Sequence, residues 1–241
     1  MLSAIIVAAG SSRRMGFDKL FAPLAGKPVL WHSIRAFSDC PSVHEILIVT
    51  REDRMDEVEN LVSTEELTRV KKVISGGAER HMSVWNGLQA VDSEGCDFIA
   101  IHDGARPLTT PKLIKSCLDL AREHGAACCA SQIPDTVKRA SIENMVTESV
   151  ERAGLWAMQT PQIFSSGLIL QAYAGLMSKH EMVTDEVSAV QKLGKKIALL
   201  KNEEWNFKIT FPHDLELAEH VLGLRGKKNK SSPKRTARLA S

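Results

Sequence analysis

The sequence of 241 residues lacks any uninterrupted apolar run near the roughly 18 residues that a membrane-spanning helix needs. A secretory leader has a basic stretch followed by an apolar one, and the N-terminus of this sequence lacks that pattern. The five cysteines are odd in number and form no C-x-x-C pair. These absences argue against a membrane-embedded protein and against a disulfide-rich secreted one. We expect a soluble protein of the reducing cytoplasm, with one domain of ordinary size.

The charge is unevenly distributed. Residues 225–241 contain seven lysines and arginines, no acid and almost no large apolar residue, so we expect this basic tail to be disordered. The remaining residues hold 24 of the 31 basic side chains against all 29 acids, which gives residues 1–224 a net charge of −5. Contact of the tail with nucleic acid or a membrane surface is a minor alternative, because short basic ends are unspecific.

Short apolar runs alternate with segments of helical spacing along most of the chain. Such alternation predicts an α/β fold with a doubly wound, mostly parallel sheet. The expected strands are 2–8, 45–49, 70–74, 98–101 and 126–133. Among the helices, Thr110 and Pro111 offer an N-cap and a first-turn proline, and a last helix is expected to open at Pro212 and end at Gly223.

Residues 134–155 break this alternation. Two short polar strands are expected there, on either side of residues 141–144. A two-stranded hairpin with few apolar residues is not stable alone. We therefore expect an arm that protrudes and packs against a second subunit.

The first strand runs into a loop of small residues that carries three cations, Arg13, Arg14 and Lys19. Backbone N–H groups in such a turn can hold phosphate oxygens while the cations neutralise their charge. The loop is no P-loop, since Phe17 follows Gly16, and no dinucleotide fingerprint, since Ser12 replaces its second glycine. We interpret it as a triphosphate cradle, and a basic surface turn is the alternative.

Two later loops point to the same edge of the predicted sheet. Gly76 and Gly77 precede the helix that contains Ser83, and Asp103 follows the strand that ends at Ile101. Open α/β sheets bind ligands at the carboxyl ends of their strands. Three loops at one edge therefore predict a single ligand site there.

Three further polar positions each have an ordinary structural reading. Arg152 could pair with Glu151 or Glu148, Thr184 could cap a helix whose first turn is acidic, and Lys208 could face solvent from a strand. His102 is expected only to satisfy hydrogen bonds at its strand end.

Taken together, the motifs resemble the 2-C-methyl-D-erythritol 4-phosphate cytidylyltransferase family over about residues 1–222. The segments that carry the resemblance are Ala8-Ala9-Gly10 with Arg14-Met15, Lys19, Gly76-Gly77, His102 to Pro107, Asp135 to Lys138, Arg152 to Trp156, Thr160-Pro161-Gln162, Thr184-Asp185-Glu186 and Lys208. The resemblance implies a fold of the nucleotide-diphospho-sugar transferase type with a protruding β-arm. It also implies transfer of a cytidylyl group from CTP to 2-C-methyl-D-erythritol 4-phosphate, a divalent ion such as Mg²⁺ held mainly by the CTP phosphates, and a homodimer with shared active sites.

The resemblance further implies roles for individual residues. Arg14 and Lys19 would stabilise the transition state around the triphosphate, and Arg152 and Lys208 would orient the second substrate. Nucleotide contacts would come from Ala8, Ala9, Gly10, Gly77, Ser83, Asp103 and Gly104. Arg106, Thr136 and Thr184 would assist at the second substrate, with Thr136 and Arg152 lent to the neighbouring subunit by the arm. Asp103 is the candidate to approach the metal.

Ala78 departs from many relatives, which carry an acid after the paired glycines, so a ribose or metal contact there is in doubt. The reaction itself needs no general base, since a phosphate monoester with a second pKa of about 6 is already largely a dianion at neutral pH. The alternatives are a cytidylyltransferase for another polyol phosphate, such as ribitol 5-phosphate, and a non-catalytic protein that binds nucleotide or nucleic acid. The segment 152–156 with residues 160–162 favours the methylerythritol substrate.

Overall fold

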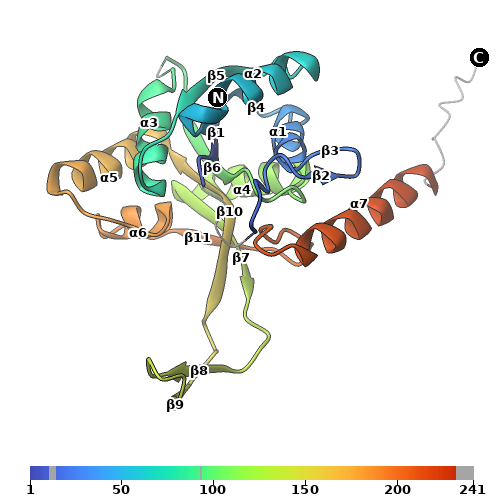
Figure 1. Cartoon of the computed structure of the whole chain (residues 1–241). Coiled ribbons are helices and arrows are strands. Elements are labelled where there is room, and N and C mark those ends of the chain that lie inside the picture. The colour runs from blue at the N-terminus through green and yellow to red at the C-terminus, as the bar shows by residue number, and fades with distance from the viewer. Residues whose placement is uncertain (11–14, 93, 232–241) are drawn as a thin grey trace, which may run out of the picture.

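The computed structural model describes residues 1–10, 15–92 and 94–231. Its main body is a seven-stranded sheet with helices on both faces, as the sequence predicted (Figure 1). The strand order is β11-β7-β10-β6-β1-β4-β5. The strands of this sheet are β1 (Leu2–Ala8), β4 (Val43–Thr50), β5 (Val70–Ser75), β6 (Phe98–Asp103), β7 (Ala126–Gln132), β10 (Trp156–Ser165) and β11 (Ala198–Lys201).

All pairings in this sheet are parallel except those of β10, which runs antiparallel to both β6 and β7. The strand order reverses beside β1: β4 and β5 extend from one side of it, and β6 lies on the other. Such a reversal leaves a crevice at the carboxyl ends of the two central strands. The sequence therefore pointed to the edge at which the topology opens.

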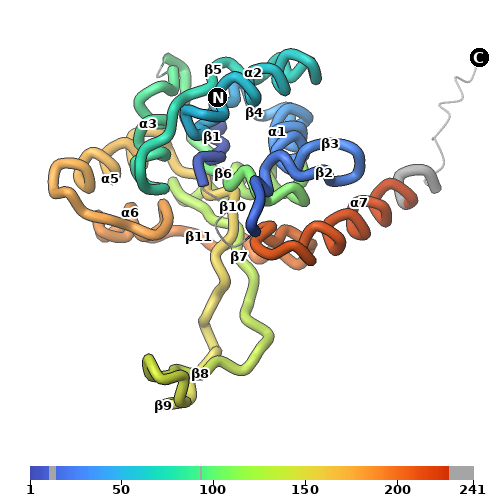
Figure 2. The backbone as a smooth tube through the Cα atoms, viewed as in Figure 1, coloured from blue at the N-terminus to red at the C-terminus, as the bar shows by residue number. Residues whose placement is uncertain are grey.

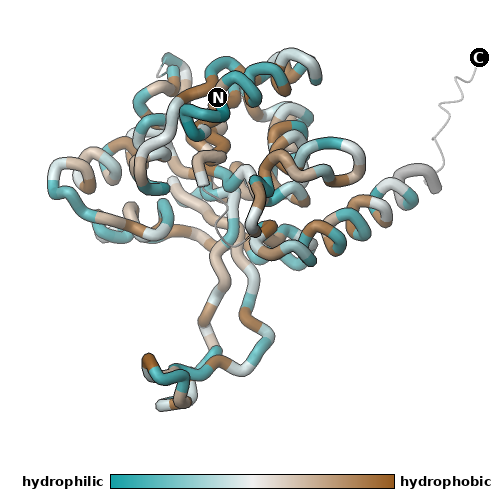
Figure 3. Tube along the Cα trace, in the orientation of Figure 1, coloured by the Kyte–Doolittle hydropathy of each residue, from teal (hydrophilic) through white to brown (hydrophobic). Residues whose placement is uncertain are grey.

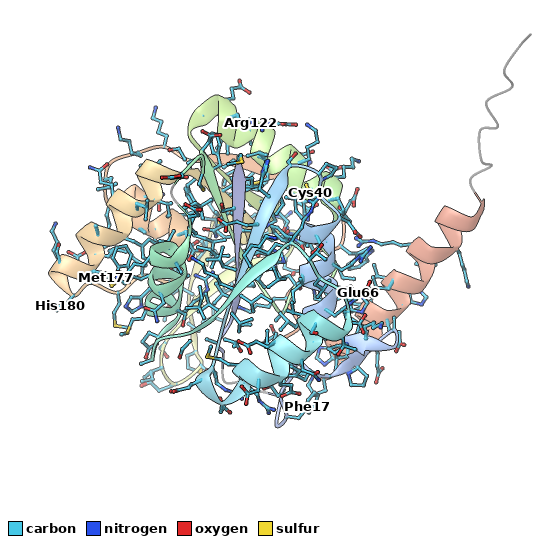
Figure 4. The ribbon with its side chains drawn as sticks, turned by 90° about the horizontal axis from the view of Figure 1, so that it is seen from above. Phe17, Cys40, Glu66, Arg122, Met177 and His180 are labelled. Carbon is cyan, nitrogen blue, oxygen red and sulfur yellow. The ribbon has the colours of Figure 1, made fainter. Side chains whose placement is uncertain are left out.

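Two sets of helices sandwich the sheet because the central strands are apolar on both faces. Ala4, Ile6 and Ala8 of β1 pack toward one face with α1 and α4, whereas Ile5 packs toward the other with α3 and α5. Figure 4 views these two layers of side chains from above. The helices are α1 (Val29–Ser38), α2 (Met55–Thr64), α3 (Arg80–Ala90), α4 (Pro111–His124), α5 (Ser166–Lys179), α6 (Glu186–Gln191) and α7 (His213–Ser231), with a 3₁₀ turn η1 (Glu52–Arg54) and a small ribbon of β2 (Pro23–Leu24) and β3 (Lys27–Pro28).

The start of α4 follows the sequence signal. The side chain of Thr110 accepts a hydrogen bond from the backbone N–H of Leu113, and Pro111 occupies the first turn. Gly125, in the left-handed region at φ 79°, ends the helix.

The arm is a separate hairpin. Strands β8 (Val137–Ala140) and β9 (Val146–Val150) pair only with each other among the described strands, and they hang below the body in Figures 1 and 2. The arm leaves from the carboxyl end of β7, which is the edge of the sheet where β1 and β6 also end. Figure 3 shows its chain to be mostly hydrophilic, with apolar residues at the tip.

The C-terminal helix corrects one expectation. We predicted a helix end at Gly223 and disorder from residue 225, but α7 continues to Ser231. Arg225 belongs to the folded body, because its guanidinium donates to the backbone oxygens of Leu108 (2.7 Å) and Trp205 (3.1 Å). The rest of the basic tail, residues 232–241, lies outside the described residues. No helix in the described ranges is both long and apolar enough to cross a membrane.

Candidate active site

A pocket of about 630 Å³ opens at the carboxyl ends of β1 and β6. That volume falls within the range of small-molecule sites. The pocket is lined by Val7, Ala8, Ala9, Gly10, Met15, Lys19, Leu20, Arg51, Gly77, Ala78, Glu79, Arg80, Ser83, Asp103, Ala105, Lys208 and Thr210. Eight of the predicted site residues are in this set, and they come from five separate stretches of the chain.

The glycine turn after β5 lies very close to the first loop. The backbone N–H of Gly76 donates to the carbonyl of Thr50 at 2.7 Å, and a Cβ at Gly76 would come within 2.6 Å of the Ala9 side chain. Only glycine allows this approach. The Gly77 N–H in turn points at the Ser83 hydroxyl, 3.1 Å away at the start of α3. The ends of two loops, residues 8–10 and Gly77, therefore line the pocket together.

Asp103 is the electrostatic centre of the site. Its Oδ2 accepts a hydrogen bond from the Lys208 ammonium at 3.0 Å and lies 3.4 Å from Nε of Arg106. Its Oδ1 accepts from Nη2 of Arg80 at 3.2 Å. Burial raises the pKa of this carboxyl, but the charges of Arg80, Lys208 and Arg106 lower it by more, to well below the usual range. Asp103 is thus ionised at neutral pH.

The two lysines of the pocket come from opposite ends of the sequence. Lys19 donates to the backbone oxygen of Ile209 at 2.7 Å, next to Lys208. Lys208 lies in a segment without strand structure, so the alternative of a solvent-facing strand lysine is wrong, and the predicted site residue does line the pocket. The segment is anchored by the hydrogen bond from Ile209 N–H to the Ala105 oxygen (2.8 Å), which places Lys208 beside Asp103.

His102 is buried, with both ring nitrogens in hydrogen bonds. Nδ1 lies 2.9 Å from the Thr160 hydroxyl, and Nε2 lies 3.3 Å from the Arg106 oxygen. Since the Arg106 carbonyl can only accept, Nε2 carries the proton, and Nδ1 of the neutral ring accepts from the Thr160 hydroxyl, which itself accepts from the Asp103 N–H. Burial lowers the pKa of His102 to about 3, so this ring is a neutral brace for the loop that holds Asp103, as expected.

Arg106 and Gly104 support the pocket without lining it. Arg106 donates to the Asn206 backbone oxygen at 2.8 Å as well as contacting Asp103. Gly104 donates its N–H to the Val7 oxygen at 2.9 Å, and this brings the ends of β6 and β1 together. Arg14, the other predicted transition-state cation, lies outside the described residues.

Three predicted substrate residues are not brought to this pocket by the single chain. Thr136 and Arg152 are exposed at the base of the arm, and Thr184 is exposed ahead of α6. Arg152 donates to the Pro134 oxygen, and neither acid suggested as its partner holds it: Glu148 pairs with Arg139 instead. The N-cap of α6 is Asp185 rather than Thr184, since the Asp185 carboxylate accepts from Ser188 N–H at 3.0 Å.

The sequence reasoning missed Arg51, Arg80 and Glu186. Arg51 lines the pocket and pairs with Asp18, beside Lys19, at 3.2 Å. Arg80 directly follows the glycine turn, so its position was a usable signal. Glu186 was taken for part of an acidic first turn, whereas its side chain is fully buried and pairs with Arg80. Only the packing of α6 against α5 and α3 reveals this.

No cluster of three or more His, Cys, Asp or Glu side chains that could hold a metal occurs in the part of the chain that the structure describes. Asp103 is an ionised oxygen donor that lines the pocket. A single carboxylate suits Mg²⁺, which keeps several waters and takes phosphate oxygens as ligands. Since both Asp103 oxygens already accept from Arg80, Arg106 and Lys208, the site fits a cation carried mainly by a bound triphosphate.

The family model for 2-C-methyl-D-erythritol 4-phosphate cytidylyltransferase (IspD) matches residues 2–224. The chain is 38% identical over 224 residues to the protein of that name from Caldanaerobacter subterraneus, covering 92% of this chain and 98% of the relative. It is 37% identical over 229 residues to the one from Bacillus mycoides, covering 94% and 100%.

Solved structures agree with these sequence relatives. The 4-diphosphocytidyl-2C-methyl-D-erythritol synthase of Anaerococcus prevotii superposes with a TM-score of 0.80 at 28% identity, covering 92% of this chain and 96% of that one. The 2-C-methyl-D-erythritol 4-phosphate cytidylyltransferase of Thermus thermophilus gives 0.76 at 29% identity, covering 91% and 98%.

Proposed function

Because the chain belongs to the 2-C-methyl-D-erythritol 4-phosphate cytidylyltransferase family, we propose that the pocket at the ends of β1 and β6 is where it performs that reaction. The enzyme transfers a cytidylyl group from CTP to 2-C-methyl-D-erythritol 4-phosphate and releases pyrophosphate. The relatives favour neither another polyol phosphate nor a non-catalytic role. The observation that supports the site most strongly is the contact between Lys208 and Asp103, 105 residues apart, inside the pocket.

In the proposed reaction an oxygen of the substrate phosphate attacks the α-phosphorus of CTP in line. A new P–O bond forms, the bond to the bridging oxygen of the β-phosphate breaks, and pyrophosphate leaves with that electron pair. The attacking phosphate is already ionised at neutral pH, so no residue must remove a proton. This agrees with the neutral, fully hydrogen-bonded state of His102.

The protein's task is to bring anions together and to stabilise the charge that develops. We assign the triphosphate to Lys19, Arg14 and the backbone at Ala8, Ala9, Gly10 and Gly77, with Ser83 and Gly104 shaping the nucleotide side. Lys208 serves the acceptor phosphate from its place against Asp103. Support comes from the lining of the pocket, which brings a cation-bearing loop and a glycine turn to one edge.

A divalent cation, which we propose to be Mg²⁺, would be held by the CTP phosphates with Asp103 as its protein contact. When bound, such an ion neutralises negative charge on the triphosphate. Asp103 supports this role because its carboxylate remains ionised and lines the pocket. Ala78 also lines the pocket but has no polar side chain with which to contact a ribose or metal.

We also propose that the enzyme is a homodimer in which the arm completes the neighbour's site. Ile142, Met145 and Val146 at the arm tip have exposed fractions of 94%, 68% and 67%, so a partner surface would shield them from water. The arm carries Thr136 and Arg152, which would contact the methylerythritol phosphate together with Thr184 and Arg106. The five unpaired thiols support a reducing compartment, the cytoplasm.

Purified protein incubated with CTP, Mg²⁺ and one acceptor phosphate tests the proposal. Pyrophosphate release should require 2-C-methyl-D-erythritol 4-phosphate and be far slower with ribitol 5-phosphate. The variant Lys208→Ala should lose most of the release, whereas Lys112→Ala, at an exposed lysine on α4, should retain it. Faster release with ribitol 5-phosphate, or full activity of Lys208→Ala, would overturn the proposal.

A further inference from the structure

A buried charge cluster lies behind the pocket, and the reaction described above leaves part of it unexplained. We call it the Arg80 cluster: Arg80 at the start of α3, Asp103 at the end of β6, Glu186 at the start of α6 and Tyr173 in α5. Glu186 and Tyr173 are completely buried, and the Arg80 side chain has an exposed fraction of 28%. Four separate elements therefore meet at one guanidinium.

Arg80 binds both carboxylates at once. Nη1 and Nη2 donate to Glu186 at 2.5 and 3.1 Å, and Nη2 also reaches Oδ1 of Asp103 at 3.2 Å. The Tyr173 hydroxyl donates to the same Glu186 carboxylate at 3.1 Å. The planar fork of a guanidinium suits such two-sided pairing, which an ammonium could not reproduce.

The direction of the pKa shifts agrees with this geometry. Burial lowers the pKa of Arg80, but the charges of Glu186 and Asp103 raise it by more, so that it lies above the ordinary value. Burial and the Glu186 charge both raise the pKa of Tyr173, which stays a neutral donor. Arg80 is therefore a cation paired with two carboxylates, of which Glu186 serves it alone and Asp103 is shared with Lys208 and Arg106.

Arg80 nevertheless lines the pocket, three residues after Gly77, whose backbone we assign to the triphosphate. An unbalanced guanidinium at that place would be a strong ligand for phosphate oxygens. In the structure, Nε, Nη1 and Nη2 of Arg80 donate instead to Asp103 and Glu186.

We propose that Glu186 is a positioning residue that holds Arg80 against Asp103 and so keeps this guanidinium from binding the phosphates. This inference rests on the proposed function, because it assigns the neighbouring pocket to CTP and pyrophosphate. Two consequences follow. Asp103 presents Oδ2 to Lys208 and Arg106 because Oδ1 is held by Arg80, and pyrophosphate can leave because one cation of the pocket is already neutralised.

The test measures turnover and, separately, the binding of pyrophosphate with Mg²⁺ by calorimetry without other substrates. In Glu186→Gln, which preserves the side-chain size, pyrophosphate should bind about tenfold more tightly and kcat should fall about tenfold, while KM for CTP does not rise. Glu65→Gln is the matched control: it removes a carboxylate paired with Lys27 at 2.6 Å, outside the pocket lining. Its pyrophosphate affinity and kcat should equal those of the wild type.

The double variant Arg80→Gln/Glu186→Gln removes both charges and provides a second comparison. It can also be measured if the single variant Glu186→Gln does not fold. Its pyrophosphate affinity should remain within about threefold of the wild type, because Arg80 is not a phosphate ligand, while kcat stays low. Unchanged or weaker pyrophosphate binding by folded Glu186→Gln would overturn the inference. So would a tenfold loss of pyrophosphate binding in the double variant.

The two readouts separate the inference from the proposed function. If the wild type released no pyrophosphate from CTP and the methylerythritol substrate, the proposed function would fail. The calorimetric comparison of pyrophosphate binding would still support or overturn the role of Glu186.

Discussion

The pocket and the arm present their charged residues in opposite ways. In and behind the pocket, Asp103 and Glu186 are buried: Asp103 pairs with three cations at 3.0 to 3.4 Å, and Glu186 pairs with Arg80 at 2.5 Å. On the arm, Thr136 and Arg152 are exposed, and the Arg152 guanidinium donates to the nearby backbone oxygen of Pro134. The difference is what we expect under the proposal that one chain builds the nucleotide half of the site and a second chain completes the acceptor half.

The largest effect is expected inside the pocket. Lys19→Ala should lower kcat by at least about a hundredfold, the usual cost of losing one preorganised donor to a developing charge. Steady-state pyrophosphate release measures this, with Lys112→Ala as the exposed control. A loss below tenfold would show that Lys19 does not act on the transition state.

The arm should respond differently. Arg152→Ala should raise KM for 2-C-methyl-D-erythritol 4-phosphate by about tenfold or more and lower kcat, while CTP binding stays within about twofold of the wild type. Arg152→Lys should not restore the activity, because a guanidinium grips phosphate with two hydrogen bonds. Arg139→Ala, which breaks an exposed pair with Glu148 on the same hairpin, is the control. If Arg152→Ala weakened the binding of CTP and of the acceptor phosphate equally, the pocket and the arm would not serve different substrates.

A third effect concerns stability beside the pocket. His102 has a pKa of about 3 when folded and of about 6.5 when unfolded, so between these values the unfolded chain binds more protons. The free energy of unfolding should therefore fall as the pH falls, with about 2 kcal/mol from His102 between pH 6.5 and 5. Urea unfolding should show a shallower pH dependence for His102→Gln and an unchanged one for the exposed His124→Gln. If the pH dependence of the unfolding free energy were the same in His102→Gln as in the wild type, His102 would not be neutral and buried in the folded protein.

The smallest effect is expected at the C-terminus. Deletion of residues 232–241 should leave pyrophosphate release within about twofold, since these residues lie beyond the family match, which ends at residue 224. Arg225→Ala should instead cost about 1 to 2 kcal/mol of stability, because its guanidinium donates to two backbone oxygens of the body. Thermal unfolding should show a lower midpoint for Arg225→Ala and an unchanged one for the deletion variant. A large loss of activity in the deletion variant would show that the tail takes part in the reaction.

The sequence predicted the parallel core well because its strands are continuous apolar runs. The predicted strand 2–8 coincides with β1, and the expected edge of the sheet carries the pocket. Strand β10 was missed, since Thr160-Pro161 interrupts its pattern and its antiparallel pairing has no local signal. The last helix is longer than predicted, because Gly223, where we expected it to end, is tolerated inside α7.

Some residues of the candidate site could likewise be predicted from the sequence, and others could not. Loops that follow strands, such as those with Gly77 and Asp103, could be placed from the order of the motifs. Glu186 could not, because its contact with Arg80 spans 106 residues and depends on how α6 packs. Lys208 needed the family resemblance, since nothing in residues 206–210 distinguishes it from a surface lysine.

The proposal that each site joins the body of one subunit to the arm of another can be tested by mixing two variants, each impaired in a different part of the site. Arg152→Ala and Lys208→Ala are unfolded together, refolded at equal amounts and assayed for pyrophosphate release, with each variant refolded alone as control. Half of the dimers should be mixed and keep one intact site, so activity should return to about a quarter of the wild type. No recovery in verified heterodimers would contradict a shared site.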